Sequence, residues 1–124
     1  MSEGTNTEEV KEKKLMVGEI TGDALILLEN QNTDYSRVMF ETGGWVEDGD
    51  VAVVYVKKFN RALLTQALMI IDKGELHFGE WVLINLRIGG VEKDVIVNDI
   101  NMLHNFSSTA AYLIKPKIGA IKKK

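Results

Sequence analysis

The sequence contains no cysteine, a single proline and no long apolar run. Without cysteine the chain has no disulfide framework, no thiolate ligands for a zinc ribbon and no cysteine nucleophile. No apolar run approaches the roughly 20 residues that a membrane-spanning helix needs, and the first residues lack the charged-then-apolar pattern of a signal peptide. We therefore expect a cytoplasmic protein that does not contact a membrane.

An excess of positive charge is also missing, since 15 Lys and Arg against 18 Asp and Glu leave a net charge of -3. This balance disfavours nonspecific coating of nucleic acid. There is no Gly-x-x-x-x-Gly-Lys phosphate-binding loop and no Ser/His/Asp triad pattern. The two histidines, His77 and His104, are far apart and lack metal-ligand spacing. We expect no metal, no cofactor and no catalytic residues; a small enzyme is a third alternative, because fold does not exclude activity.

The composition fits one domain. A chain of 124 residues with 45% hydrophobic content can bury about two-thirds of its unfolded surface on folding, so its stability does not require disulfides or a structural metal. Residues 1–14 are polar and mix Glu with Lys, so we expect a disordered N-terminal tail. Residues 118–124 end in lysines and predict a basic, solvated tail. The folded domain is expected over 15–117.

Short runs rich in β-branched, aromatic or other apolar residues, separated by turn signals, predict strands through most of this domain. The run at 35–42 alternates, and the run at 51–56 is almost wholly apolar. Two further runs flank Gly89-Gly90, which is typical of a hairpin or a sharply bent strand pair. The predicted strands are 15–20, 24–28, 35–42, 51–56, 81–88, 91–97 and 110–114.

Two segments are less clear. Residues 62–71 show helical spacing, but Met69-Ile70-Ile71 before a turn signal favours a strand over the second half. Residues 98–105 are polar and predict a short helix or turn before the last strand. Many short strands without a long amphipathic helix indicate an all-β fold, and closure of the sheet would remove its exposed edges. We predict a single small OB-like β-barrel.

The order of motifs in the C-terminal third resembles a known family. In order along the chain, these motifs are Gly89-Gly90, the run at 91–97, Asn101-Met102-Leu103-His104-Asn105-Phe106 and Ala111-Tyr112-Leu113-Ile114-Lys115. The arrangement is similar to the OB-fold small subunit of archaeal and eukaryotic DNA-directed RNA polymerases, which in eukaryotes is the eighth, shared subunit. The similarity is specific over 81–117 only, and Asn105 stands where the family has glycine.

The resemblance implies a non-catalytic subunit that docks on the largest subunit of RNA polymerase and supports its assembly in transcription. It further implies a monomer when isolated, association with the nucleoid through the polymerase, and docking by a sheet edge or the Gly-Gly hairpin. Plainer interpretations stay open: the glycines satisfy a turn that needs positive φ, and the apolar side chains plug the barrel end. The predicted interface residues are Gly89, Gly90, Leu103, His104 and Phe106.

The alternative function is that of a free-standing OB-fold protein that binds single-stranded nucleic acid. On such a barrel, aromatic side chains stack on bases and basic side chains contact phosphates. The plainer interpretation is that the lysines are solvated strand ends. In the polymerase hypothesis any contact with nucleic acid is indirect. The candidate nucleic-acid-binding residues are Trp45, Tyr55, Lys57, Lys58, Phe59 and Arg61.

Overall fold

The computed structural model describes residues 16–42 and 50–114. Of these residues 55% are helical and 21% lie in strands, so the predicted all-β fold is wrong. The described strands form an open antiparallel sheet in the order β1-β2-β3, and no barrel closes. The predicted tails, 1–14 and 118–124, fall outside the described residues.

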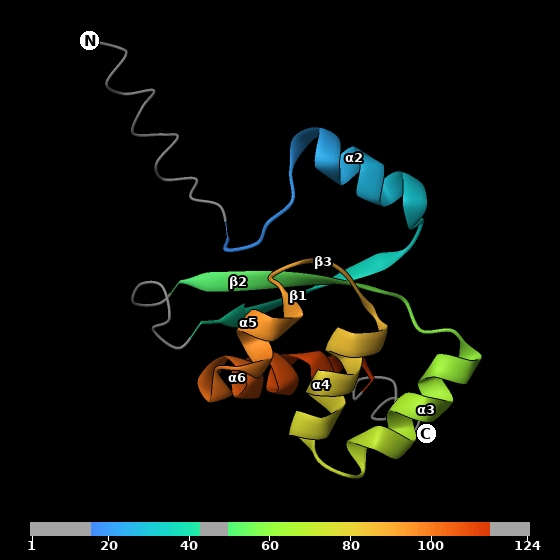
Figure 1. Cartoon of the computed structure of the whole chain (residues 1–124). Coiled ribbons are helices and arrows are strands. Elements are labelled where there is room, and N and C mark those ends of the chain that lie inside the picture. The colour runs from blue at the N-terminus through green and yellow to red at the C-terminus, as the bar shows by residue number, and fades with distance from the viewer. Residues whose placement is uncertain (1–15, 43–49, 115–124) are drawn as a thin grey trace.

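Helices cover both faces of the sheet (Figure 1). Helix α2 lies on one face, while α4, α5 and α6 lie on the other, with α3 packed beside α4. The strands are β1 (Tyr35–Glu41), β2 (Val51–Lys57) and β3 (Arg87–Gly90). The helices are α2 (Gly22–Gln31), α3 (Arg61–Ile71), α4 (Glu75–Asn85), α5 (Lys93–Val97), α6 (Ile100–Ala110) and the short 3-10 helix η1 (Ala111–Leu113).

The middle strand, β2, divides the hydrophobic core in two. Successive side chains of a strand point to opposite faces, so Val54 joins the large cluster under α4 and α6, whereas Tyr55 joins a smaller cluster under α2. Burial on both faces explains why this run is apolar without alternation. The strands predicted at 35–42 and 51–56 are confirmed.

The run predicted as a strand at 81–88 is mainly the second half of α4. The buried side chains Phe78, Val82 and Leu86 are four residues apart and therefore lie on one helical face. Trp81 stacks beside Phe78 with a ring-centroid distance of 6.1 Å. The strand prediction was wrong because it began at Trp81, in the middle of the helix. The segment it considered left out Phe78, the first buried residue of the helical apolar period.

The C-terminal strands are helical as well. The run at 91–97 is mostly α5, and the run at 110–114 is the end of α6 followed by η1. Met102, Phe106 and Ala110 are buried at spacings of four, which places them on one face of α6. The short helix or turn predicted at 98–105 was therefore a full helix, and no last strand follows it within the described residues.

Side-chain caps fix where two of these helices begin. The Asn60 side chain accepts a hydrogen bond from the Leu63 N–H at 2.8 Å, and α3 occupies the ambiguous 62–71 segment over its whole length. A carboxylate oxygen of Asp99 accepts from the N–H groups of Asn101 and Met102 at 3.0 and 3.2 Å. Such caps satisfy backbone donors that the first helical turn leaves free.

The N-terminal predictions fail in a similar way. Residues 24–28, predicted as a strand, belong to α2. Within the described part of the predicted strand at 15–20, Val17 alone forms a bridge, parallel to Ala52 of β2. The half-buried Ile20 and Leu25 pack on the α2 side of the sheet, so these apolar residues cover β2 rather than extend the sheet.

Helices α4 and α6 pack closely where Gly79 meets Ser107. A Cβ atom on Gly79 would lie 1.8 Å from the Ser107 Oγ and 2.6 Å from its Cβ. Both residues are buried, and the Ser107 hydroxyl has no hydrogen-bond partner among the described residues. The contact therefore depends on the missing side chain of Gly79.

We expect Gly79→Ala to lower the free energy of unfolding by about 1–3 kcal/mol, because the added methyl group overpacks this contact. Urea denaturation measures the change. In the Gly79→Ala/Ser107→Gly double variant the nearest remaining atom, the Ser107 Cα, lies at 3.0 Å. The double variant should lose less stability than the sum of the two single changes. The exposed neighbour Glu80→Ala is the control, and equal midpoints for it and Gly79→Ala would contradict the prediction.

Candidate functional site

The residues predicted for a partner interface are not gathered on the surface. Leu103 and Phe106 are buried in the core between α6 and the sheet. His104 is exposed on the same helix. Gly89 and Gly90 lie in β3, half-buried against β2. Of these five predicted interface residues, only His104 is exposed.

The two glycines serve close packing within the fold. Gly90 has a φ of 94°, and a Cβ there would lie 2.4 Å from the Val53 carbonyl oxygen. A Cβ on Gly89 would lie 2.6 Å from the Ile20 Cδ1. Positive φ and backbone proximity both favour glycine. The pair forms part of a strand hydrogen-bonded to β2, so the predicted hairpin with 91–97 is wrong.

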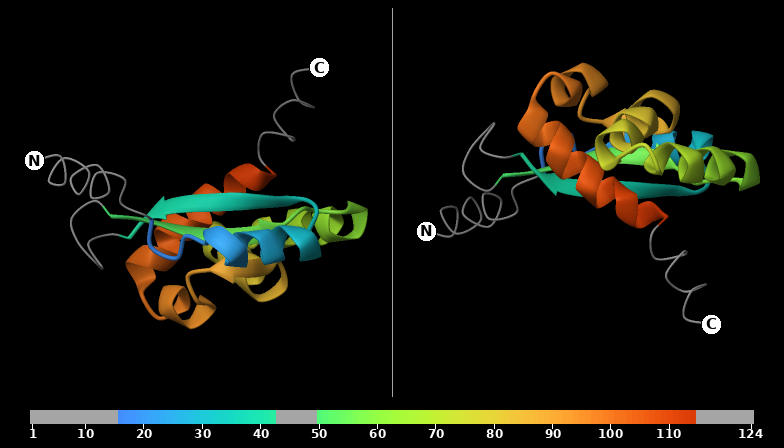
Figure 2. Two further views of the ribbon diagram at one scale, coloured as in Figure 1. Left: turned by 90° about the horizontal axis from the view of Figure 1, so that it is seen from above. Right: turned by 90° about the horizontal axis from the view of Figure 1, so that it is seen from below.

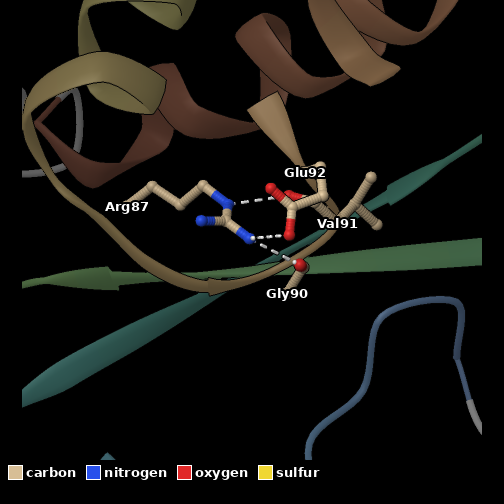
Figure 3. A network of polar contacts seen from close by, with 4 residues as sticks. All are labelled: Arg87, Gly90, Val91 and Glu92. Atoms are coloured by element: carbon tan, nitrogen blue, oxygen red, sulfur yellow. Dashed lines mark hydrogen bonds and ion pairs between the residues drawn. The ribbon is translucent and has the colours of Figure 1, made fainter. Parts of the chain in front are cut away.

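Arg87 holds the chain between β3 and α5 (Figure 3). Its Nε donates to the Val91 carbonyl oxygen and its Nη2 to the Gly90 carbonyl oxygen, both at 2.8 Å. The same Nη2 lies 3.5 Å from a carboxylate oxygen of Glu92. These contacts engage the guanidinium group within its own turn, so we assign Arg87 a structural role.

The candidate nucleic-acid-binding residues are also dispersed. Tyr55 is buried, and its hydroxyl oxygen accepts a hydrogen bond from the Ile20 N–H at 3.0 Å, so its ring is not open to a base. Phe59 is half-buried against the large core cluster. Lys57, Lys58 and Arg61 are exposed, at the end of β2, in the connection that follows it and at the start of α3. Trp45 lies outside the described residues. Of the candidate aromatic residues, the two that the structure describes, Tyr55 and Phe59, therefore offer these basic side chains no fully exposed ring.

Residues suited to a metal are not gathered in the described part of the chain either. Within 16–42 and 50–114 no group of three or more His, Asp or Glu side chains could hold an ion. A hollow of about 400 Å³ beside Asp94 and Asp99 contains carboxylates that are already engaged. Asp94 pairs with Lys93 at 3.3 Å, and Asp99 caps α6. None of the described helices has the length and apolar character needed to cross a membrane.

The outer edge of β1 is the clearest open feature of the sheet. Among the described residues, β1 pairs with β2 alone. Beyond its end, the Thr42 N–H donates to the Asp50 carbonyl oxygen at 3.0 Å, which shows that Thr42 faces β2. Because backbone groups alternate direction along an antiparallel strand, the N–H and C=O groups of Arg37, Met39 and Glu41 point outward.

Helix α6 packs against the face of the sheet next to this edge. It crosses beneath β1, and its C-terminal end extends past the outer side of the strand (Figure 2). The Asn105 Nδ2 donates to the Glu41 carbonyl oxygen at 3.0 Å, which agrees with an outward orientation of that carbonyl. Strand and helix enclose an open groove of about 380 Å³. It is lined by Met39, Phe40, Glu41, Val51, Asn105, Ser108 and Thr109.

The groove offers hydrogen bonding and apolar contact but no reactive constellation. The Ser108 hydroxyl donates to a Glu75 carboxylate oxygen at 3.2 Å, and the Thr109 hydroxyl donates to the Asn105 carbonyl oxygen at 3.0 Å. What faces the opening is main-chain N–H and C=O of β1 and the Asn105 amide. The 44% exposed side chain of Met39 projects from the other face of the strand, because its neighbours Val38 and Phe40 point into the cluster under α6. This set matches the needs of an extended polypeptide.

Comparison with known proteins adds no relative from which a function could be transferred. No protein-family model, curated protein or solved structure matches the chain. The open edge of β1 and the groove beside it are therefore the basis for assigning a function.

The other end of β1 is tied to α2. The Tyr35 hydroxyl donates to a Glu29 carboxylate oxygen at 2.8 Å, and the Tyr35 ring lies 5.9 Å, centroid to centroid, from the Tyr55 ring. The hydrogen bond to Glu29 is the main cause that raises the pKa of Tyr35 above its ordinary value of 10.0. Neutral phenol is favoured because phenolate would lose this bond and face a carboxylate.

We expect Glu29→Gln to lower the pKa of Tyr35 toward its ordinary value. A pKa raised by folding means that this contribution to stability is complete below pH 10.0 and is lost as the pH rises through the raised value. Ultraviolet titration of tyrosinate absorbance measures the pKa, with Tyr35→Phe identifying the signal. A titration curve that Glu29→Gln leaves unchanged would disprove the assignment.

Proposed function

We propose that this protein is a non-catalytic protein-interaction module that binds an extended polypeptide segment by strand addition at β1. The observation that carries this proposal is the run of outward-facing backbone groups at Arg37, Met39 and Glu41, beside the groove above α6. Main-chain hydrogen bonds supply affinity in strand addition, and pockets for alternate side chains supply specificity.

The edge of β1 lacks several of the features that commonly block strand addition. The strand is seven residues long, contains neither proline nor lysine, and pairs with β2 in an unbroken register from Tyr35↔Lys57 to Glu41↔Val51. Edge strands that must stay unpaired tend to be short, bulged or guarded by lysine and proline. At this edge Asn105 already binds one backbone carbonyl, and an amide suits recognition of a further main chain.

The largest subunit of RNA polymerase remains a hypothesis for the partner. It now depends on the order of motifs in the C-terminal third, because the barrel that came with the resemblance is wrong. Leu103 and Phe106, expected at the interface, are core residues. The part of this hypothesis that the geometry supports is docking through a sheet edge, and it does so at β1. A role in transcription stays a prediction.

We expect Met39→Pro to weaken binding of strand-forming peptides about tenfold or more, whereas Met39→Ala keeps most of the affinity. Proline removes the outward N–H at the middle of the edge, while the hydrogen bonds to β2 are made by the neighbouring residues. Alanine removes the side chain and keeps the N–H. Peptides selected from a displayed random library on the unaltered protein provide the ligands, and fluorescence anisotropy measures their affinity.

Circular dichroism provides the control that both variants remain folded. N-methylation of alternate peptide amides gives an independent readout, since it removes main-chain donors without changing side chains. If the selected peptides bind Met39→Pro as tightly as the unaltered protein, or tolerate N-methylation at every position, strand addition at β1 is refuted.

A further inference from the structure

The outer edge of β1 is complementary to itself, and we propose that its occupant is a second copy of this chain. The three described strands of each copy would then form one continuous six-stranded antiparallel sheet with two-fold symmetry. This inference rests on the proposed strand addition at β1 and names the partner that binds there.

The register of such a dimer follows from which backbone groups are free. Antiparallel pairing centred on Met39 places Met39 opposite its counterpart, and places Arg37 opposite Glu41 of the second copy. The symmetry operation produces the reciprocal pair. Because all three residues point their N–H and C=O groups outward, each pairing is of the hydrogen-bonded type, giving about six main-chain hydrogen bonds.

The charges at the edge fit this register. Arg37, Met39 and Glu41 are exposed and lie on the same face of the strand, since side chains two residues apart share a face. Neither Arg37 nor Glu41 forms a salt bridge with another described residue. Directly opposed Arg and Glu side chains stabilise a strand pair, and like charges destabilise it. A copy of the strand therefore meets an opposite charge at both flanking positions.

The centre of the edge is apolar. Met39 is 44% exposed, and a two-fold axis beside it would pack the two thioether side chains against each other. Methionine adapts its shape readily to such contacts. Asn105 occupies one lone pair of the Glu41 carbonyl oxygen, and a carbonyl oxygen has a second lone pair for the Arg37 N–H of the second copy.

Helix α6 is placed to support this arrangement. Its C-terminal end extends past the outer edge of β1 on one face of the sheet (Figure 2). A two-fold axis perpendicular to the sheet keeps both copies of α6 on that same face. Each α6 would then lie beneath the β1 strand of the second copy. The monomer expected from the polymerase resemblance is replaced, in this proposal, by a symmetric dimer.

Sedimentation velocity of the full chain and its charge variants tests the register. R37E places an acid opposite Glu41 of the second copy, and E41R places a base opposite Arg37 of the second copy. Because like charges then face each other at both flanking positions, each variant alone should dimerise about tenfold more weakly than the unaltered chain. In an equimolar mixture, one copy carries acids and the other carries bases at both positions. The mixture should therefore form heterodimers, and the R37E/E41R double variant should recover homodimers, because opposite charges face each other again.

Three outcomes would overturn the dimer: an unaltered chain that stays monomeric up to about millimolar concentration, single variants that dimerise like the unaltered chain, or a mixture that gives no recovery. Circular dichroism of each variant controls for folding, and both positions are exposed. If the chain is monomeric but Met39→Pro still weakens binding of the selected peptides, the dimer is overturned while strand addition at β1 stands. Loss of the peptide effect as well would overturn strand addition itself.

Discussion

Strand β2 is hydrogen-bonded along both of its edges and covered on both of its faces. Strand β1 occupies one edge, and β3 together with Val17 occupies the other. Helix α2 covers one face, and α4 and α6 cover the other. A fully paired strand must have all its backbone groups satisfied by neighbours, and Gly90 of β3 approaches it more closely than a residue with a side chain could, since a Cβ there would lie 2.4 Å from the Val53 carbonyl oxygen. The positions of the helices follow from this one strand.

Local chemistry was sufficient to predict the two long strands. An alternating run in β1 and a continuous β-branched run in β2 have few competing interpretations. The helices were missed because the segments taken as strands began or ended inside them, so that the helical spacing of the apolar residues was not recognised. Phe78, Val82 and Leu86 show a period of four only when the segment is taken from Glu75 onward. The caps at Asn60 and Asp99 were readable signals of helix starts, and they indicate α3 and α6 from the sequence alone.

The candidate site depends on information that no local pattern contains. Asn105 reaches the Glu41 carbonyl oxygen across 64 residues of sequence, and the groove exists only because α6 crosses β1. The alternation in β1 showed that this segment is a strand, but it did not show that one edge of the strand is free. Whether a strand lies at the edge or the centre of a sheet is decided by its neighbours, which long-range packing selects.

The same long-range packing explains why the family resemblance did not predict the fold. A Leu-x-x-Phe spacing can close the end of a barrel, but on a helix it also places Leu103 and Phe106 on one buried face. Gly-Gly can turn a hairpin, and here it lets β3 approach β2. The residues of each motif thus serve packing inside the protein. The inner edges of the sheet are likewise paired, and at the other outer strand, the four-residue β3, the Gly90 carbonyl oxygen already accepts a hydrogen bond from Arg87. Among the described strands, the seven-residue β1 therefore offers a partner the longer free edge. A function that works through main-chain recognition is best sought at the edge that folding leaves unpaired.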